Sequence, residues 1–121
     1  MASLREIMST DLVSVQPSAT VAEAAQLMSI RHVGSVLVME EGAGLVGIFT
    51  ERDIVGALAS EFDAAHHAVA DWMTRGPVVM DLNVGAREAL DRMLLEGFRH
   101  LPVADGDRIV GIVSLRDLAP R

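Results

Sequence analysis

Apolar residues follow two alternating patterns along this chain of 121 residues. Short continuous apolar runs are typical of buried strands, and apolar residues that recur every three or four positions are typical of one face of a helix. In the first half of the chain, the strand-like runs are Leu12–Val15, Ser35–Met39 and Leu45–Phe49, and the helical stretches are 21–30 and 51–62. This order predicts a β-α-β-β-α unit and a mixed α/β (α+β) fold.

The second half of the chain repeats the same order. Its strand-like runs are Val78–Met80, Leu101–Ala104 and Ile109–Val113, one helix is expected from about Gly85, and a short helix is expected from Leu115. Acidic and glycine residues separate the last two strands of each half, as in a hairpin. The pattern therefore predicts a second β-α-β-β-α unit.

The two halves also match residue by residue. A shift of 65 positions, which becomes 64 after one residue is lost in the hairpin, aligns these identical residues: Met8 with Met73, Val13 with Val78, Glu23 and Ala24 with Glu88 and Ala89, Met28 with Met93, Val38 with Val103, Val46, Gly47 and Ile48 with Val110, Gly111 and Ile112, and Arg52 and Asp53 with Arg116 and Asp117. Each half alone would bury too little surface to be stable. We expect one small domain made of two copies, 1–62 and 72–121, with a polar connector over 63–71.

Helix signals support these boundaries. Thr20 and Glu23 have the spacing of a capping box at the start of the first helix. His32 follows that helix and is expected to end it near its negative pole. Met28 and Met93 occupy helical core positions, so packing explains them better than a binding surface does.

Composition and charge exclude several classes of function. The net charge of −7 opposes binding to nucleic-acid phosphates, and few aromatic side chains are available to stack on bases. The chain has no cysteine, which suits a reducing cytoplasm, and no apolar run near the ~20 residues that span a membrane. Neither a catalytic triad nor a phosphate-binding loop is present, so we expect no enzyme. The pair His66 and His67 lacks further metal ligands, so we expect a solvated connector and no metal site.

One motif occurs at the same place in both copies, where a buried strand turns into a helix. It places Thr50 and Asp53 in the first copy, and Ser114 and Asp117 in the second, at the first turn of a helix. Unpaired backbone N–H groups and the positive dipole end favour anions there. A carboxylate can accept hydrogen bonds from ribose hydroxyls, and a neighbouring arginine can bind phosphate. Alternatively the two residues only cap the helix, and the two roles are compatible.

Together these features resemble a tandem pair of cystathionine-β-synthase (CBS) domains, the Bateman module. The resemblance rests on the element order, the repeated Gly-x-x-Ser/Thr-x-x-Asp, the segment Arg-His-Leu-Pro-Val at 99–103, and the entry segments Ile-Met-Ser at 7–9 and Trp-Met-Thr at 72–74. It covers nearly the whole chain. It implies two intertwined repeats related by a pseudo-twofold axis, whose clefts bind an adenosine-containing regulatory ligand such as AMP, ADP, ATP, NAD or S-adenosylmethionine. It also implies a homodimer in which two pairs form a disc.

The resemblance implies two candidate ligand sites. The first consists of Ser114, Arg116 and Asp117, the basic pair Arg99 and His100, and Thr10, Leu12 and Val13 for the adenine. The second consists of Thr50, Arg52 and Asp53 with Thr74, Pro77 and Val78.

The second of these sites departs from the family pattern. Gly34 and Ser35 stand where the second copy has Arg99 and His100. We therefore expect the Asp117 site to bind anionic ligands better, and the Asp53 site to be weaker, empty or selective for a less charged ligand. His100 itself has two open readings, a phosphate contact or a structural bond at the start of its strand.

Two functions follow from this reading. In the first, the protein is a non-catalytic sensor of an adenosine-type ligand, with energy sensing as its expected role, and its output acts on a separate effector protein. In the second, it is a constitutive dimerisation or docking module in which both aspartates only cap helices.

Overall fold

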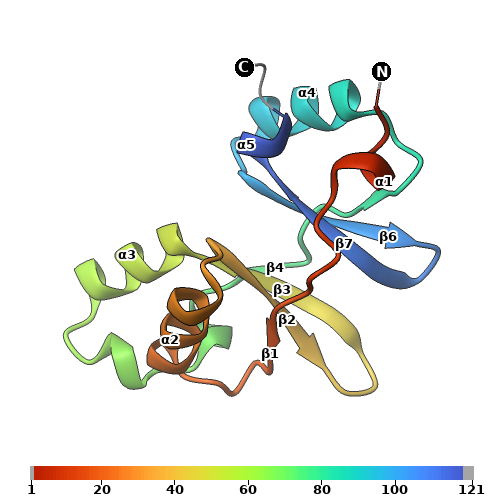
Figure 1. Ribbon diagram of the computed structural model, residues 1–121. Coiled ribbons are helices and arrows are strands. Elements are labelled where there is room, and N and C mark those ends of the chain that lie inside the picture. Colours follow the sequence, from red (N-terminus) through yellow and green to blue (C-terminus); the bar gives the residue numbers. More distant parts are fainter. Residues whose placement is uncertain (1, 119–121) are drawn as a thin grey trace. The chain divides into compact units, whose positions relative to one another are not determined.

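A computed structural model of the chain describes residues 2–118 and shows two compact units (Figure 1). One unit, Val13–Pro77, is called the first-copy unit because it holds the long hairpin of the first copy. The other, called the second-copy unit, combines the residues up to Leu12 with those from Val78 onward. Helices and strands come from both halves of the sequence, which confirms the predicted mixed α/β class.

The first-copy unit is a four-stranded sheet covered by helices. Its elements are β1 (Ser14–Val15), α2 (Val21–Arg31), β2 (Ser35–Glu40), β3 (Gly44–Thr50), α3 (Glu51–Ser60), the short 3-10 helices η1 (Ala64–His66) and η2 (Val69–Asp71), and β4 (Thr74–Arg75). The strands lie in the order β1-β2-β3-β4, with β1 parallel to β2 and the other neighbours antiparallel. Alternate residues of β2 and β3, among them Val36, Val38 and Phe49, are buried in one core with Met28 of α2.

The second-copy unit has the same plan. Its elements are α1 (Leu4–Ile7), β5 (Met80–Asp81), α4 (Ala86–Glu96), β6 (His100–Asp105), β7 (Arg108–Ser114) and α5 (Leu115–Leu118). The sheet order is β5-β6-β7, and a bridge between Ser9 and Ile112 adds the N-terminal segment beside β7. The core contains Leu101, Val103 and Val113 from the sheet and Met93 from α4.

Each half of the sequence contributes to both units. Leu4 of α1 is fully buried in the core of the second-copy unit, and Val69 of η2, at the aligned position, is fully buried in the core of the first-copy unit. The two residues make the same contact, since Leu4 N donates to Val84 O and Val69 N donates to Ala19 O. The compact units are therefore offset from the sequence repeats, and the two entry segments are exchanged between them.

Two glycines make room for the exchanged entry segments. A Cβ atom placed on Gly47 would lie 2.9 Å from the carbonyl oxygen of Thr74 and 3.0 Å from Met73 Cγ. One placed on Gly111 would lie 2.8 Å from Met8 Cγ. Both glycines are buried, so the close approach of the entry methionine explains why the strands carry no side chain there.

The helix boundaries follow the predicted signals. Thr20 Oγ1 accepts a hydrogen bond from Glu23 N and Glu23 Oε1 accepts one from Thr20 N, both at 3.0 Å, so the capping box is confirmed. His32 ends α2 in the left-handed conformation with φ 56°, and Gly97 ends α4 with φ 79°. The prediction that His32 ends the helix is confirmed. Residues with a side chain rarely adopt this left-handed conformation, so a glycine would fit the position more easily.

The structure differs from the expectations in three respects. Helix α3 ends at Ser60, short of Phe62. Strands β1 and β5 are only two residues long and begin later than predicted, since only Ser14–Val15 and Met80–Asp81 form ladder pairs. The segment 63–71 is not simply a solvated connector, because Ala64 and Val69 are fully buried. The sequence of this segment is typical of a loop, because its two buried residues stand alone and form neither a strand-like nor a helical apolar pattern.

Candidate functional site

The Asp117 turn lies in the second-copy unit, where β7 ends and α5 begins. Ser114 N donates a hydrogen bond of 2.9 Å to Asp117 Oδ2, so the carboxylate caps the short helix. Asp117 and the adjacent Arg116 are exposed, and Ser114 is half-buried. The Asp117 carboxylate therefore caps the helix and is also accessible to solvent.

The structure brings the basic pair to this turn. His100 lies directly opposite Ser114 in the antiparallel ladder of β6 and β7. The neighbouring Leu115 N donates a 2.7 Å hydrogen bond to Arg99 O. Arg99 is exposed and His100 is half-buried. The open end of this hairpin therefore carries two arginines, a histidine, a hydroxyl group and a carboxylate.

The residues expected to contact the adenine, Thr10, Leu12 and Val13, lie in two different units. Ser9 N and O both bond to Ile112 at 2.9 Å, so Thr10 and Leu12, which are exposed, continue the segment that runs beside β7. Val13 belongs to the first-copy unit, where it is 7% exposed and part of the core. The structure therefore places Val13 in a different unit from Thr10 and Leu12.

The Asp53 turn in the first-copy unit is a complete capping box. Thr50 N donates to Asp53 Oδ2 at 2.8 Å, Thr50 Oγ1 donates to the same oxygen at 3.2 Å, and Asp53 N donates to Thr50 Oγ1 at 3.4 Å. Partial burial raises the pKa of Asp53 above its ordinary value, and the bonds from Thr50 and the charge of Arg52 counteract this only in part.

Small residues replace the basic pair beside Asp53. Ser35 is buried opposite Thr50 in the ladder of β2 and β3, and Glu51 N donates to Gly34 O at 3.1 Å. These contacts reproduce those of His100 and Arg99, so the alignment of the two copies holds in three dimensions. At these aligned positions, the first-copy unit has neither basic side chain.

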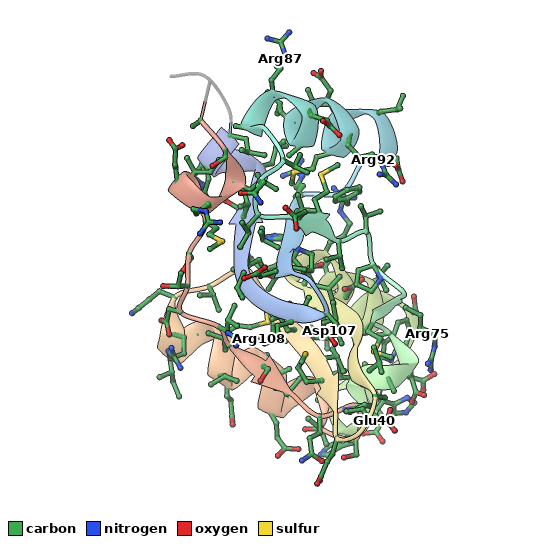
Figure 2. All side chains as sticks on the ribbon, turned by 90° about the vertical axis from the view of Figure 1, so that its right-hand side faces the viewer. Glu40, Arg75, Arg87, Arg92, Asp107 and Arg108 are labelled. Carbon is green, nitrogen blue, oxygen red and sulfur yellow. The ribbon has the colours of Figure 1, made fainter. Side chains whose placement is uncertain are left out.

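The remaining residues of the second candidate site, Thr74, Pro77 and Val78, are divided between the two units. Thr74 is exposed and pairs with Ile48, and Pro77 is half-buried at the end of the unit. Val78 belongs to the second-copy unit, where it packs against the core. Arg75, which the sequence reading missed, lies opposite Gly47 and donates a 3.2 Å hydrogen bond to Ala70 O (Figure 2). The signal was available, because the shift of 65 aligns Arg75 with Thr10.

The described residues, 2–118, contain one further contact between possible metal ligands. His66 Nδ1 lies 2.7 Å from Asp63 Oδ1, but no group of three or more metal-ligating side chains occurs in this part of the chain. None of the described helices is both long and apolar enough to cross a membrane.

Known proteins share this architecture. The family model described as "CBS domain" matches residues 4–60 and again 69–120. The CBS domain-containing protein YhcV of Bacillus subtilis is 34% identical over 98% of this chain and 84% of its own. The crystal structure of the CBS-domain containing protein ATU1752 from Agrobacterium tumefaciens has a TM-score of 0.92 and 30% identity, and covers 97% of this chain and 96% of that one.

A further solved structure is a complex. It is CBSX2 in complex with AMP, with a TM-score of 0.82 and 25% identity, covering 98% of this chain and 93% of that chain. CBS-domain pairs are generally regulatory modules, and the family match indicates no catalytic family. The two matches, one for each copy, show that this chain belongs to the CBS domain family as a tandem pair.

Proposed function

We propose that this protein is a non-catalytic regulatory module that binds an adenosine-containing ligand, and that the phosphate-bearing ligands bind at the Asp117 turn. Arg99 and His100 contact the phosphate together with Arg116, and Asp117 accepts hydrogen bonds from the ribose. The module works as a homodimer in the cytoplasm and passes its state to a separate effector protein. Such a signal requires that the ligand bind two states of the module with different affinity.

One observation carries the proposal: the basic pair lies at the Asp117 turn. The ladder places His100 opposite Ser114, and the backbone bond from Leu115 holds Arg99 beside the helix start. Arginine recognises phosphate with paired, charge-assisted hydrogen bonds, which are stronger than neutral ones. The AMP complex of the related CBSX2 supports the ligand class.

The Asp53 turn is proposed to take a less charged ligand or none. Gly34 and Ser35 offer no cation there, and partial burial already disfavours the charged carboxylate of Asp53. Arg75 is the cation on the neighbouring strand.

A constitutive docking module is the second candidate, because both aspartates accept hydrogen bonds from their own helix starts. In that case the carboxylates stabilise helices and no nucleotide binds. Sedimentation and melting temperature, each measured with and without nucleotide, separate the two functions, since the docking module responds to no nucleotide in either measurement.

The decisive test compares Arg99→Gly with Arg108→Ala during titration of AMP and adenosine, followed by melting temperature. Arg99→Gly installs the residue of the first copy, and Arg108, at the far end of the same hairpin, is the matched loss of charge (Figure 2). Ligand at a hundredfold excess over Kd stabilises the folded state by ~2.7 kcal/mol. Losing a bond to a charged group costs about 1.5–3 kcal/mol, so AMP should bind at least about tenfold more weakly to Arg99→Gly.

The adenosine titration separates a phosphate contact from general damage. Adenosine lacks the phosphate, so Arg99→Gly should bind it like the wild type, and Arg108→Ala should change neither ligand. The proposal fails if AMP, ADP, ATP, NAD and S-adenosylmethionine all leave the melting temperature of the wild type unchanged. It also fails if Asp117→Ala retains the full shift.

A further inference from the structure

Trp72, the only tryptophan of the chain, carries a buried hydrogen-bond donor without a partner. Its ring packs against the core of the first-copy unit, and its indole Nε1 is shielded from solvent. No acceptor lies within hydrogen-bond distance of this atom among the residues that the structure describes, and no other buried side-chain nitrogen or oxygen of those residues is in this state. A buried donor without an acceptor is costly, and a buried tryptophan N–H normally has a partner. This N–H therefore needs an acceptor that the described part of the chain does not supply.

Trp72 lies at the end of the sheet that holds the Asp53 turn. Strand β4 is antiparallel to β3, and Thr74 lies opposite Ile48. Trp72 precedes Thr74 by two residues. Thr50 follows Ile48 by two residues, so Trp72 and Thr50 are reached in the same direction along the two strands. Helix α3 begins there with the capping box described above, so the unpaired donor and the Asp53 turn share one end of the first-copy unit.

The Asp53 turn is also more enclosed than its counterpart. Asp53 is half-buried, whereas Asp117 is exposed. Ile54, the next residue of α3, packs against the same core as Trp72. An enclosed site disfavours a charged ligand, because burial removes the water that surrounds the charge. The Asp53 turn therefore suits a ligand without a phosphate.

The two units differ in the donors that they bring to their turns. The residue of the second-copy unit that aligns with Trp72 is Ile7, which has no donor in its side chain. That unit has Arg99 and His100 at its turn instead. An indole N–H only donates and carries no charge, so a neutral ring nitrogen, carbonyl or hydroxyl can accept its bond. A site with a buried donor rejects a ligand that lacks the matching acceptor, because the donor then stays unpaired.

We propose that Trp72 determines the specificity of the Asp53 turn by donating its indole N–H to a neutral acceptor of an uncharged nucleoside. The Asp117 turn selects a ligand by its phosphate, and the Asp53 turn selects one by an uncharged hydrogen-bond acceptor. This inference rests on the proposed function, and it names the class of ligand for the turn that lacks the basic pair.

A titration with adenosine tests the role of Trp72 directly, because a nitrogen–proton correlation spectrum of this chain contains a single indole resonance. The titration uses Asp117→Ala, in which the second-copy site is disabled. The indole proton should move downfield as its N–H gains an acceptor, and the shift should follow the binding curve that calorimetry gives. Adding Trp72→Phe to this variant removes the N–H and keeps an aromatic ring. Adenosine should then bind about threefold to tenfold more weakly, the loss expected for one neutral hydrogen bond.

Leu27→Val is the matched control, since Leu27 packs against the same core and carries no donor. Added to Asp117→Ala, it should leave the affinity for adenosine unchanged, which separates the loss of the N–H from looser packing. The inference is overturned if adenosine binds without moving the indole resonance, if Trp72→Phe and Leu27→Val bind it alike, or if Asp117→Ala binds no adenosine. If AMP leaves the melting temperature of the wild type unchanged while adenosine still moves the indole resonance, the Asp117 site fails and the role of Trp72 stands.

Discussion

The two units of this protein share a β-hairpin that leads into a helix, and they differ in the side chains placed at that turn. In both, a hydroxyl residue ends a central strand and a carboxylate three residues later bonds back to it. In the second-copy unit, Arg99 and His100 stand at the start of the neighbouring strand β6, and in the first-copy unit Gly34 and Ser35 stand at the start of β2. The backbone contacts of these pairs are the same. A duplicated scaffold can therefore keep its architecture while only one copy retains the cations that suit a phosphate.

The largest expected effect comes from an aligned core position at which the two units differ. Phe49 and Val113 are both fully buried at equivalent places in β3 and β7. Phe49→Ala should lower the free energy of unfolding by about 3–5 kcal/mol, and Val113→Ala by about 2 kcal/mol, because the phenyl ring leaves the larger cavity. Urea unfolding of the two variants measures the difference. Equal losses would show that the two cores do not depend on these residues in the way their burial indicates.

The next largest effect on stability is expected from the two buried glycines, whose surroundings differ between the units. Gly47→Ala and Gly111→Ala should each cost about 1–3 kcal/mol, because the new methyl group overlaps its neighbours. Gly111→Ala meets the flexible side chain of Met8, whereas Gly47→Ala also meets the backbone oxygen of Thr74. Met8→Ala should therefore relieve Gly111→Ala in a double-mutant cycle.

The matching cycle in the first-copy unit is the control. Met73→Ala should relieve Gly47→Ala only in part, since the Thr74 carbonyl cannot move away. Gly56→Ala, on an exposed helix, should stabilise the folded chain by up to about 1 kcal/mol. Full relief in both cycles would contradict the role assigned to the Thr74 backbone.

The smallest effect concerns pH and two carboxyl groups of the first-copy unit. Burial raises the pKa of Asp53, so its contribution to stability is fully present below the ordinary aspartate pKa and is lost as the pH rises through the raised one. Backbone and side-chain hydrogen bonds from Thr20 lower the pKa of Glu23, so its contribution is present above the ordinary glutamate pKa and is lost as the pH falls through the lowered one.

Amide variants isolate these two contributions. The melting temperature of the wild type relative to Asp53→Asn should fall as the pH rises through the carboxyl range. Relative to Glu23→Gln it should rise over the same range. Both amides keep an oxygen that can accept the capping bond, so the charge is the main difference. Trends of the same sign for both residues would contradict the opposite shifts of pKa.

Much of the fold and of the candidate site could be predicted from the sequence, because the signals are local. The alternation of apolar and polar residues predicted the strands and helices, and the Thr20 and Glu23 spacing predicted the capping box. The duplication predicted that the Asp53 and Asp117 turns share one geometry. The prediction of a solvated connector failed at Ala64, because a single small buried residue leaves no apolar pattern in the sequence. Arg75 was overlooked although the alignment of the two copies pairs it with Thr10.

By itself, the sequence determined the repeated unit, the family and the unequal charge of the two turns, because each depends on residue type and spacing along the chain. The tertiary structure decided which residues share a core. It exchanged the entry segments, so that Met8 packs on Gly111 and Met73 on Gly47, and it brought Arg99 to Ser114 across a hairpin. These pairings depend on strand register and on which hydrophobic surface each segment covers, and neither is encoded in a local pattern.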